Sequence, residues 1–84
     1  MAALDGNAIA GTLVAVFGTE MTTAIGACAS CGTQSLVGEF AVYLRGPGTV
    51  ARCRHCAGVL MIIVEVRGVS CVDLRGLEAL EPAA

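Results

Sequence analysis

The chain has 84 residues, of which 56% are apolar and 14% are charged, and its formal net charge at pH 7 is −2. A chain of this length forms one domain, residues 1–84, and such a small domain generally needs disulfides, a metal ion or a partner subunit for stability. The arginines between Arg45 and Arg75 form no basic tract that would indicate a nucleic-acid partner. No apolar run reaches the roughly 20 residues of a membrane span, which excludes a transmembrane protein.

The cysteines and the N-terminal residues indicate where the protein works. The first charge is Asp5 and no lysine or arginine precedes Arg45, so we expect no secretory signal and a cytoplasmic protein. In a reducing cytoplasm, closely spaced cysteines bind metal or perform redox chemistry more often than they form structural disulfides. The cysteine count is five, and an odd number of thiols cannot all pair within one chain.

The first predicted element is an α-helix over residues 6–17. Asp5 is a favourable N-cap and Gly18 can end the helix. Four apolar residues between them have the spacing of one helix face: Ile9, Leu13, Val16 and Phe17. Thr12 is the only polar side chain between positions 8 and 17, so the helix is apolar nearly all round. We therefore expect it to pack on a sheet and to contact a protein partner or a second copy with its other face.

Strand patterns flank the first pair of cysteines. A β-branched run from Thr22 to Ile25 leads as a short strand into Cys28. Residues 36–45 alternate apolar and polar side chains, which predicts one half-buried strand. A turn at Gly46-Pro47-Gly48 joins this strand to an antiparallel strand over residues 49–52, which leads into Cys53.

The last third of the chain is predicted to contain a hairpin and one helical turn. Residues 59–66 are strongly β-prone, Gly68 makes a tight turn, and residues 69–74 form the returning strand. Gly76 ends that strand, and we expect one turn of helix over residues 77–80.

The paired cysteines form two C-x-x-C knuckles, residues 28–32 and 53–58, whose thiols are Cys28, Cys31, Cys53 and Cys56. Two thiolates three positions apart on a tight turn can bind one ion while turn amides donate to the sulfurs, and a small residue such as Gly32 lets the backbone fold back. A sheet that brings both turns together gives a closed tetrahedral site, which is typical of structural zinc. We predict one structural zinc ion, with iron as the alternative metal.

Other interpretations of these residues fit the pattern less well. Redox dithiols normally open a helix within a βαβ unit, which neither knuckle does, and buried free thiols would require two coincident C-x-x-C pairs. Because four cysteines already complete a site, His55 is expected to be a solvated knuckle residue rather than a ligand. Cys71 is expected to be a small buried apolar residue rather than a fifth ligand or a reactive thiol.

The polar residues indicate no catalytic site. The sequence holds no carboxylate pair, activated nucleophile or glycine-rich phosphate loop, so we expect no enzymatic activity. Arg52, Arg54 and His55 give the second knuckle a modest positive charge that can contact phosphate. Nucleic-acid-binding ribbons usually show a broader basic stripe and exposed aromatic side chains.

A family resemblance rests on segments spread over nearly the whole chain: Leu4-Asp5-Gly6-Asn7-Ala8, Phe17-Gly18, Met21-Thr22, Cys28-Ala29-Ser30-Cys31-Gly32, Pro47-Gly48, Arg52-Cys53-Arg54-His55-Cys56 and Val72-Asp73-Leu74-Arg75-Gly76. With these segments the chain resembles an uncharacterised family of short actinobacterial zinc-ribbon-like proteins. The resemblance implies a functional role only for the four cysteines. More distantly, the first knuckle resembles that of rubredoxins, but the second knuckle lacks their proline and the chain lacks their aromatic core.

These observations predict an α+β domain in which an N-terminal α-helix packs on a zinc-ribbon-like antiparallel sheet of about four to six strands, with the metal at one end. The predicted function is a metal-stabilised protein-interaction or accessory module. The alternatives are a nucleic-acid-binding zinc ribbon that uses Arg52, Arg54 and His55, and a rubredoxin-like iron electron carrier.

Overall fold

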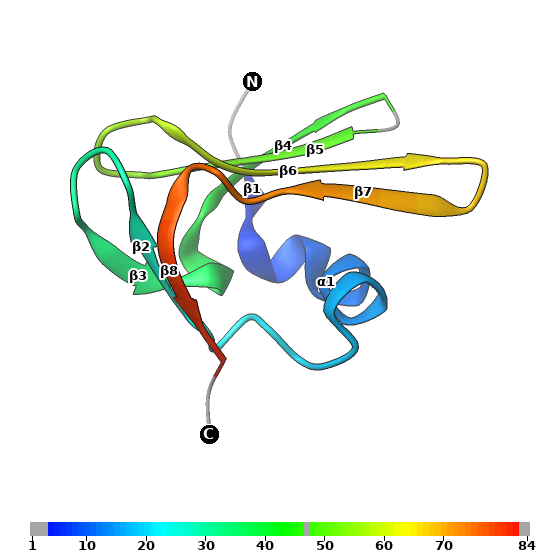
Figure 1. Ribbon diagram of the computed structural model, residues 1–84, viewed down its shortest axis with the longest axis horizontal. Coiled ribbons are helices and arrows are strands. Elements are labelled where there is room, and N and C mark those ends of the chain that lie inside the picture. The colour runs from blue at the N-terminus through cyan, green and yellow to red at the C-terminus, as the bar shows by residue number, and fades with distance from the viewer. Residues whose placement is uncertain (1–3, 47, 83–84) are drawn as a thin grey trace.

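The computed structural model describes residues 4–46 and 48–82 and contains two antiparallel sheets and an N-terminal helical segment (Figure 1). The large sheet has the strand order β1-β4-β5-β6-β7, with bounds Leu4–Asp5, Ala41–Arg45, Gly48–Arg52, Val59–Val66 and Val69–Asp73. The small sheet has the order β3-β2-β8, with bounds Gln34–Leu36, Ile25–Cys28 and Leu77–Glu81. The predicted α+β class is confirmed, but the expectation of a single sheet is wrong.

The helical segment covers the predicted residues and packs below the large sheet (Figure 1). It begins as a 3-10 helix, η1 (Gly6–Ile9), and continues as α1 (Ala10–Phe17). The Asp5 carboxylate accepts a hydrogen bond of 3.1 Å from the Asn7 amide, and Gly18 ends α1 in the left-handed conformation at φ 75°. Both predicted caps are therefore confirmed. None of the described helices is long and apolar enough to cross a membrane.

The strand that leads into the first knuckle starts later than predicted. Thr22 and Thr23 lie in a turn, where the Glu20 carboxylate accepts hydrogen bonds from the Thr22 amide at 2.6 Å and from both threonine hydroxyls. Such local side-chain bonds offer the backbone an alternative to strand pairing. Strand β2 consequently begins only at Ile25.

The predicted strand over residues 36–45 is interrupted by a 3-10 turn, η2 (Val37–Glu39). Gly38 donates its amide to Thr22 O at 2.9 Å, and a Cβ at this position would lie 2.8 Å from Asn7 Oδ1. The chain passes here from the small sheet into the large one, which alternation alone does not reveal. Strands β4 and β5 then pair antiparallel as predicted, while Pro47 of the predicted turn lies outside the described residues.

The predicted helical turn over residues 77–80 is wrong, because these residues belong to β8 and pair with β2. Ala79 pairs with Ala27 and Leu77 with Cys28, so Glu78 is an extra residue, a β-bulge. The bulge brings Leu77 and Leu80 to the same side of β8, where both are partly buried and pack against the core.

A second bulge supports the start of β6. Arg52 pairs with Val59 whereas Ala51 pairs with Met61, so Leu60 is the extra residue. Leu60 and Met61 are consecutive, yet both are buried, at 2% and 1% exposure. The core between the two sheets and the helical segment contains no buried polar side chain among the described residues; its largest fully buried members are Phe40, Leu13, Leu60, Met61, Val37 and Val42.

Candidate metal centre

Each knuckle is the connection of an antiparallel hairpin. The first knuckle joins β2 to β3 in the small sheet, and the second joins β5 to β6 in the large sheet. The two hairpin turns meet at the same end of the molecule (Figure 1). The predicted arrangement of two knuckles facing each other is thus present, although two sheets rather than one bring them together.

The two knuckles share one backbone conformation. Gly32 N donates to Cys28 O at 2.9 Å, and at the equivalent place Ala57 N donates to Cys53 O at 2.8 Å. The residue after the second cysteine is left-handed in both, with φ 77° at Gly32 and 63° at Ala57. The predicted need for a small, permissive residue at Gly32 is confirmed. Ala57 adopts the same conformation with a Cβ, which costs about 1–2 kcal/mol for an L-residue.

The four sulfurs are close enough to share one ion, since all of the Sγ atoms lie within 4.8 Å of one another. Cys28 Sγ and Cys56 Sγ are 3.6 Å apart, and Cys31 Sγ and Cys53 Sγ are 3.7 Å apart. Tetrahedral zinc with Zn–S bonds of about 2.3 Å places its sulfurs roughly 3.8 Å apart, whereas a disulfide needs about 2.05 Å. The arrangement therefore fits a metal ion and does not fit a disulfide.

One sulfur of each knuckle faces the protein interior. Cys28 and Cys53 are 2% and 5% exposed, whereas Cys31 and Cys56 are exposed. In the second knuckle the amides of His55 and Gly58 donate to the sulfurs of Cys53 and Cys56, each at 3.4 Å. Amide donors of this kind stabilise a thiolate over a thiol, as the knuckle pattern predicts.

The sulfurs do not ionise independently of one another. The hydrogen bond with the Thr33 hydroxyl, supported by the Thr33 main chain, lowers the pKa of Cys31 to about 6. The Gly58 amide lowers the pKa of Cys56, but the sulfurs of Cys28 and Cys31 outweigh it and raise that pKa to about 11. Adjacent thiolates repel one another, and a divalent cation among them would favour the ionised form of every one.

The remaining candidate residues lie outside this cluster. His55 is exposed and is not part of the four-cysteine group, in agreement with its predicted place on the solvated knuckle. The expectation that Cys71 is buried is wrong, because Cys71 is exposed on β7, where it pairs with Val64. The strand is at the edge of the large sheet, a position that the sequence around Cys71 does not reveal.

The arginines of the second knuckle bind main-chain oxygens of their own chain. Arg52 Nη1 donates to Ala57 O at 2.9 Å, within the knuckle. Arg54 Nε donates to Glu39 O at 2.6 Å and its Nη2 donates to Leu4 O at 3.4 Å. Arg54 thereby connects the second knuckle to η2 and β1. Sequence reasoning missed this positioning role because the acceptors are remote carbonyl groups without a side-chain signal.

Comparison with known proteins places the chain in a family without an assigned activity. The model described as "Family of unknown function (DUF6510)" matches residues 1–84, and the chain belongs to this family. No curated protein and no solved structure matches the chain. The four-cysteine cluster agrees with the zinc-ribbon-like resemblance that the sequence indicates.

The shared left-handed position allows a reciprocal test of the knuckle geometry. Ala57→Gly should raise the free energy of unfolding by up to about 1 kcal/mol because it removes the Cβ penalty. Gly32→Ala should lower it by about 1–2 kcal/mol for the same reason, since nothing lies within 4 Å of a Cβ there and only the φ opposes it. Urea unfolding of the metal-loaded proteins measures both, and equal effects of the same sign would contradict the assigned conformation.

A matched pair of cysteine variants tests which thiols bind metal. Cys56→Ser should weaken Zn²⁺ binding by at least about a hundredfold, because it removes one of four ligands. Cys71→Ser alters an exposed thiol that lies outside the cluster, so it should leave Zn²⁺ affinity unchanged. Competition with a chromogenic chelator measures both affinities. Equal losses in the two variants would show that the cluster is not the binding site.

Proposed function

We propose that this chain is a metal-stabilised protein-interaction or accessory module in which Cys28, Cys31, Cys53 and Cys56 hold one structural zinc ion. The observation that supports this most directly is that the four clustered thiols come from hairpin turns of two different sheets. An ion bound there cross-links the two sheets. The apparent binding free energy of structural zinc, about 10–16 kcal/mol, is as large as the whole stability of a typical domain, about 5–15 kcal/mol.

The donor set argues for a structural rather than a catalytic ion. Four thiolates fill a tetrahedral shell, whereas catalytic zinc keeps a position open for water or substrate. Among the described residues, the cluster that could hold an ion consists of cysteines alone, so no carboxylate or imidazole is among the proposed ligands. We propose that the protein has no catalytic activity of its own and works in a reducing, cytoplasmic environment, where free thiols persist.

Zinc is proposed in preference to iron. Four thiolates bind either metal, so the ligands do not decide between them. An electron carrier like rubredoxin would be expected to surround its iron with aromatic side chains, but only one aromatic residue, Phe40, is among the fully buried side chains of the described core. The second knuckle also lacks the proline that the rubredoxin resemblance implies.

Nucleic-acid binding gains no support from the second knuckle. Arg52 and Arg54 donate to carbonyl oxygens of their own chain, and the chain as a whole is acidic, with a net charge of −2. Phosphate recognition usually needs a broader set of free cations.

The exposed side of α1 is one surface for a protein partner or a second copy. The helix buries Leu13 but leaves Val14 44% exposed. Gly11, Thr12 and Ala15 are exposed beside it, so this side has small side chains and no charge. Such a surface allows close approach of another apolar surface.

The metal and its structural role are tested together on protein purified from its native source. We expect one zinc ion per chain by elemental analysis, and we expect chelation to abolish the β-sheet circular dichroism, because the ion connects the sheets. Iron in place of zinc would favour electron transfer. A metal-free protein, or a fold that survives complete chelation, would contradict a structural ion, and a strict monomer that copurifies with no partner would count against an interaction module.

A further inference from the structure

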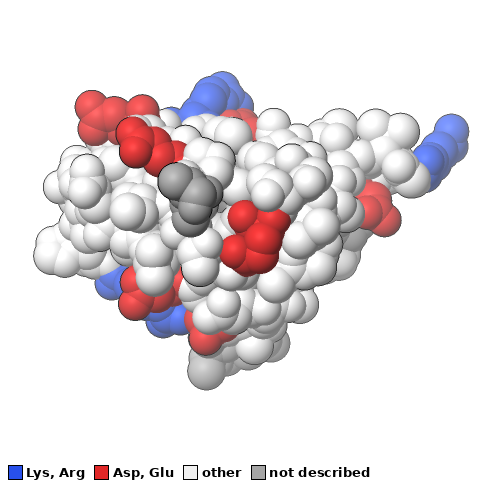
Figure 2. Space-filling view, turned by 90° about the horizontal axis from the view of Figure 1, so that it is seen from below, with Lys and Arg blue, Asp and Glu red and all other residues white. Residues whose placement is uncertain are grey.

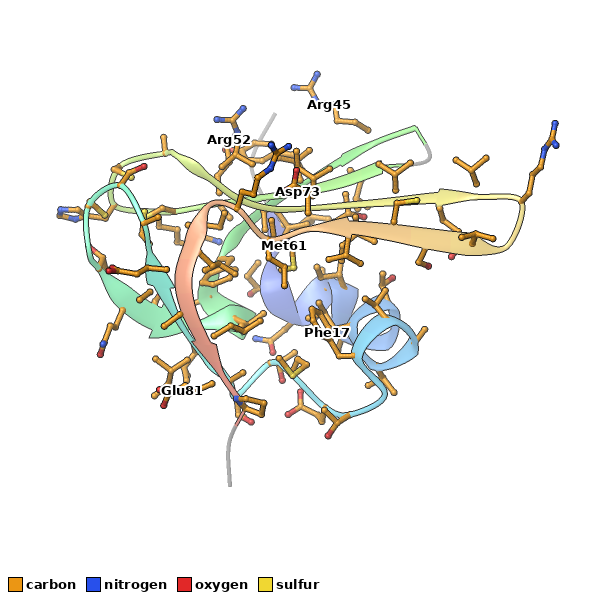
Figure 3. The ribbon with its side chains drawn as sticks, viewed as in Figure 1. Phe17, Arg45, Arg52, Met61, Asp73 and Glu81 are labelled. Carbon is orange, nitrogen blue, oxygen red and sulfur yellow. The ribbon has the colours of Figure 1, made fainter. Side chains whose placement is uncertain are left out.

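The large sheet has an inner face against the core and an opposite face, here called the outer face. Figure 3 shows Arg45 and Arg52 projecting from the outer side, away from the helix that carries Phe17. The strand register places Tyr43, Val50 and Ile62 side by side in one row of this face. None of these three side chains is fully buried, and no described element lies over them (Figure 1).

The apolar surface of the outer face continues beyond this row, along the hairpin of β6 and β7. Val64 pairs with Cys71 in the next row, and Val66 pairs with Val69 at the tip. Val66 and Val69 are 53% and 62% exposed. Single exposed apolar residues are ordinary, but a contiguous set of them indicates an interaction surface.

The outer face is also hollowed beside its arginines. A shallow depression of about 590 Å³ is lined by Tyr43, Arg45, Val50, Arg52 and Ala57. A neighbouring depression of about 330 Å³ shares Tyr43 and Arg52 and extends to the second knuckle. A partner segment lying in these depressions would therefore contact both the sheet and the side of the metal centre.

The charge on this face is positive although the whole chain is acidic. The only ion pair within residues 4–46 and 48–82 joins Arg75 to Asp73, at 2.7 Å. The register places two carboxylates on the outer face: Asp73, which this pair neutralises, and Asp5 on the edge strand β1, which accepts the Asn7 amide. Neither Arg45 nor Arg52 has a described carboxylate within ion-pair distance. The opposite side of the molecule carries scattered acidic side chains, with arginines only near its outline (Figure 2).

We propose that the outer face docks an acidic polypeptide segment of a partner protein whose apolar side chains lie on Tyr43, Val50, Ile62 and Val64 while its carboxylates pair with Arg45 and Arg52. This inference rests on the proposed interaction function and names the partner's chemistry. Charge complementarity selects this occupant. The apolar side chains need apolar partner groups, and the two guanidinium groups, which have no carboxylate partner, need acidic ones. Arg52 keeps its bond from Nη1 to Ala57 O and offers its remaining N–H donors.

The same features disfavour the other occupants. A second copy would present an identical face, and an isologous contact would bring together two surfaces of the same positive sign. On the described strands of each face only Asp5, at the edge, is a carboxylate outside an ion pair. A nucleic acid would satisfy the arginines but would leave the row from Val64 to Val69 without an apolar partner. These occupants are outcomes of the following test.

The test uses the zinc-loaded, isotopically labelled full chain and a synthetic peptide that alternates glutamate with leucine. We expect amide chemical-shift changes to concentrate at Tyr43, Val50, Ile62 and Val64, with binding that weakens as salt is raised. Arg45→Glu should weaken binding by about tenfold or more. Arg67→Glu, an equal charge change at the exposed turn between β6 and β7, should have less than a threefold effect.

Several results would overturn the inference. One is equal binding of a peptide with lysine in place of glutamate, and another is tighter binding of a single-stranded oligothymidylate, which would indicate nucleic acid. Concentration-dependent shifts at the same residues without peptide would indicate a second copy. The last is no response of a folded, metal-loaded chain to the peptide. The last result leaves the structural metal intact, because metal content and the effect of chelation are measured separately, so failure of this inference is distinguishable from failure of the proposed function.

Discussion

Four sulfurs from two hairpin turns converge at one end of the molecule, and a metal ion bound there would hold the two sheets together. The small sheet has short strands, of which β3 spans only Gln34–Leu36, and it shares one modest apolar core with the large sheet. A domain of this size buries too little surface to tolerate the loss of a major connection. Thiols at Sγ separations of 3.6 and 3.7 Å repel once they ionise, so a bound cation would turn a repulsive contact into a strongly stabilising one.

Several other features keep the second knuckle in place for this contact. Arg54 connects it to two distant main-chain oxygens, on Glu39 and Leu4. The bulge at Leu60 lets β6 fill the core immediately after the knuckle, and a Cβ on Gly76 would lie 1.8 Å from Val59 O, so the chain enters β8 in direct contact with the start of β6. The inner face of the large sheet packs on the core through Val42, Ala51, Met61 and Ile63, and the outer face is the one that we propose for a partner beside the metal centre.

The sequence predicts the local features of this molecule well and its long-range pairing poorly. The caps at Asp5 and Gly18, the β6 strand and both knuckles depend on neighbouring residues, and all are present. The division into two sheets depends on pairing between β2 and β8, which are remote in sequence. The bulge at Glu78 hides the strand period of β8, so the segment is mistaken for a helical turn. The exposure of Cys71 and the role of Arg54 likewise follow from the topology and have no sequence signal.

If one metal ion unites the two sheets into a single cooperative unit, its removal must loosen both sheets together, and amide hydrogen exchange before and after complete chelation measures whether it does. We expect slowly exchanging amides of β4, β5 and β6 in the large sheet and of β2 in the small sheet to lose their protection together when the ion is removed. Persistent protection of both sheets in a protein shown to be free of metal would contradict it, because the apolar core alone would then suffice to hold the fold.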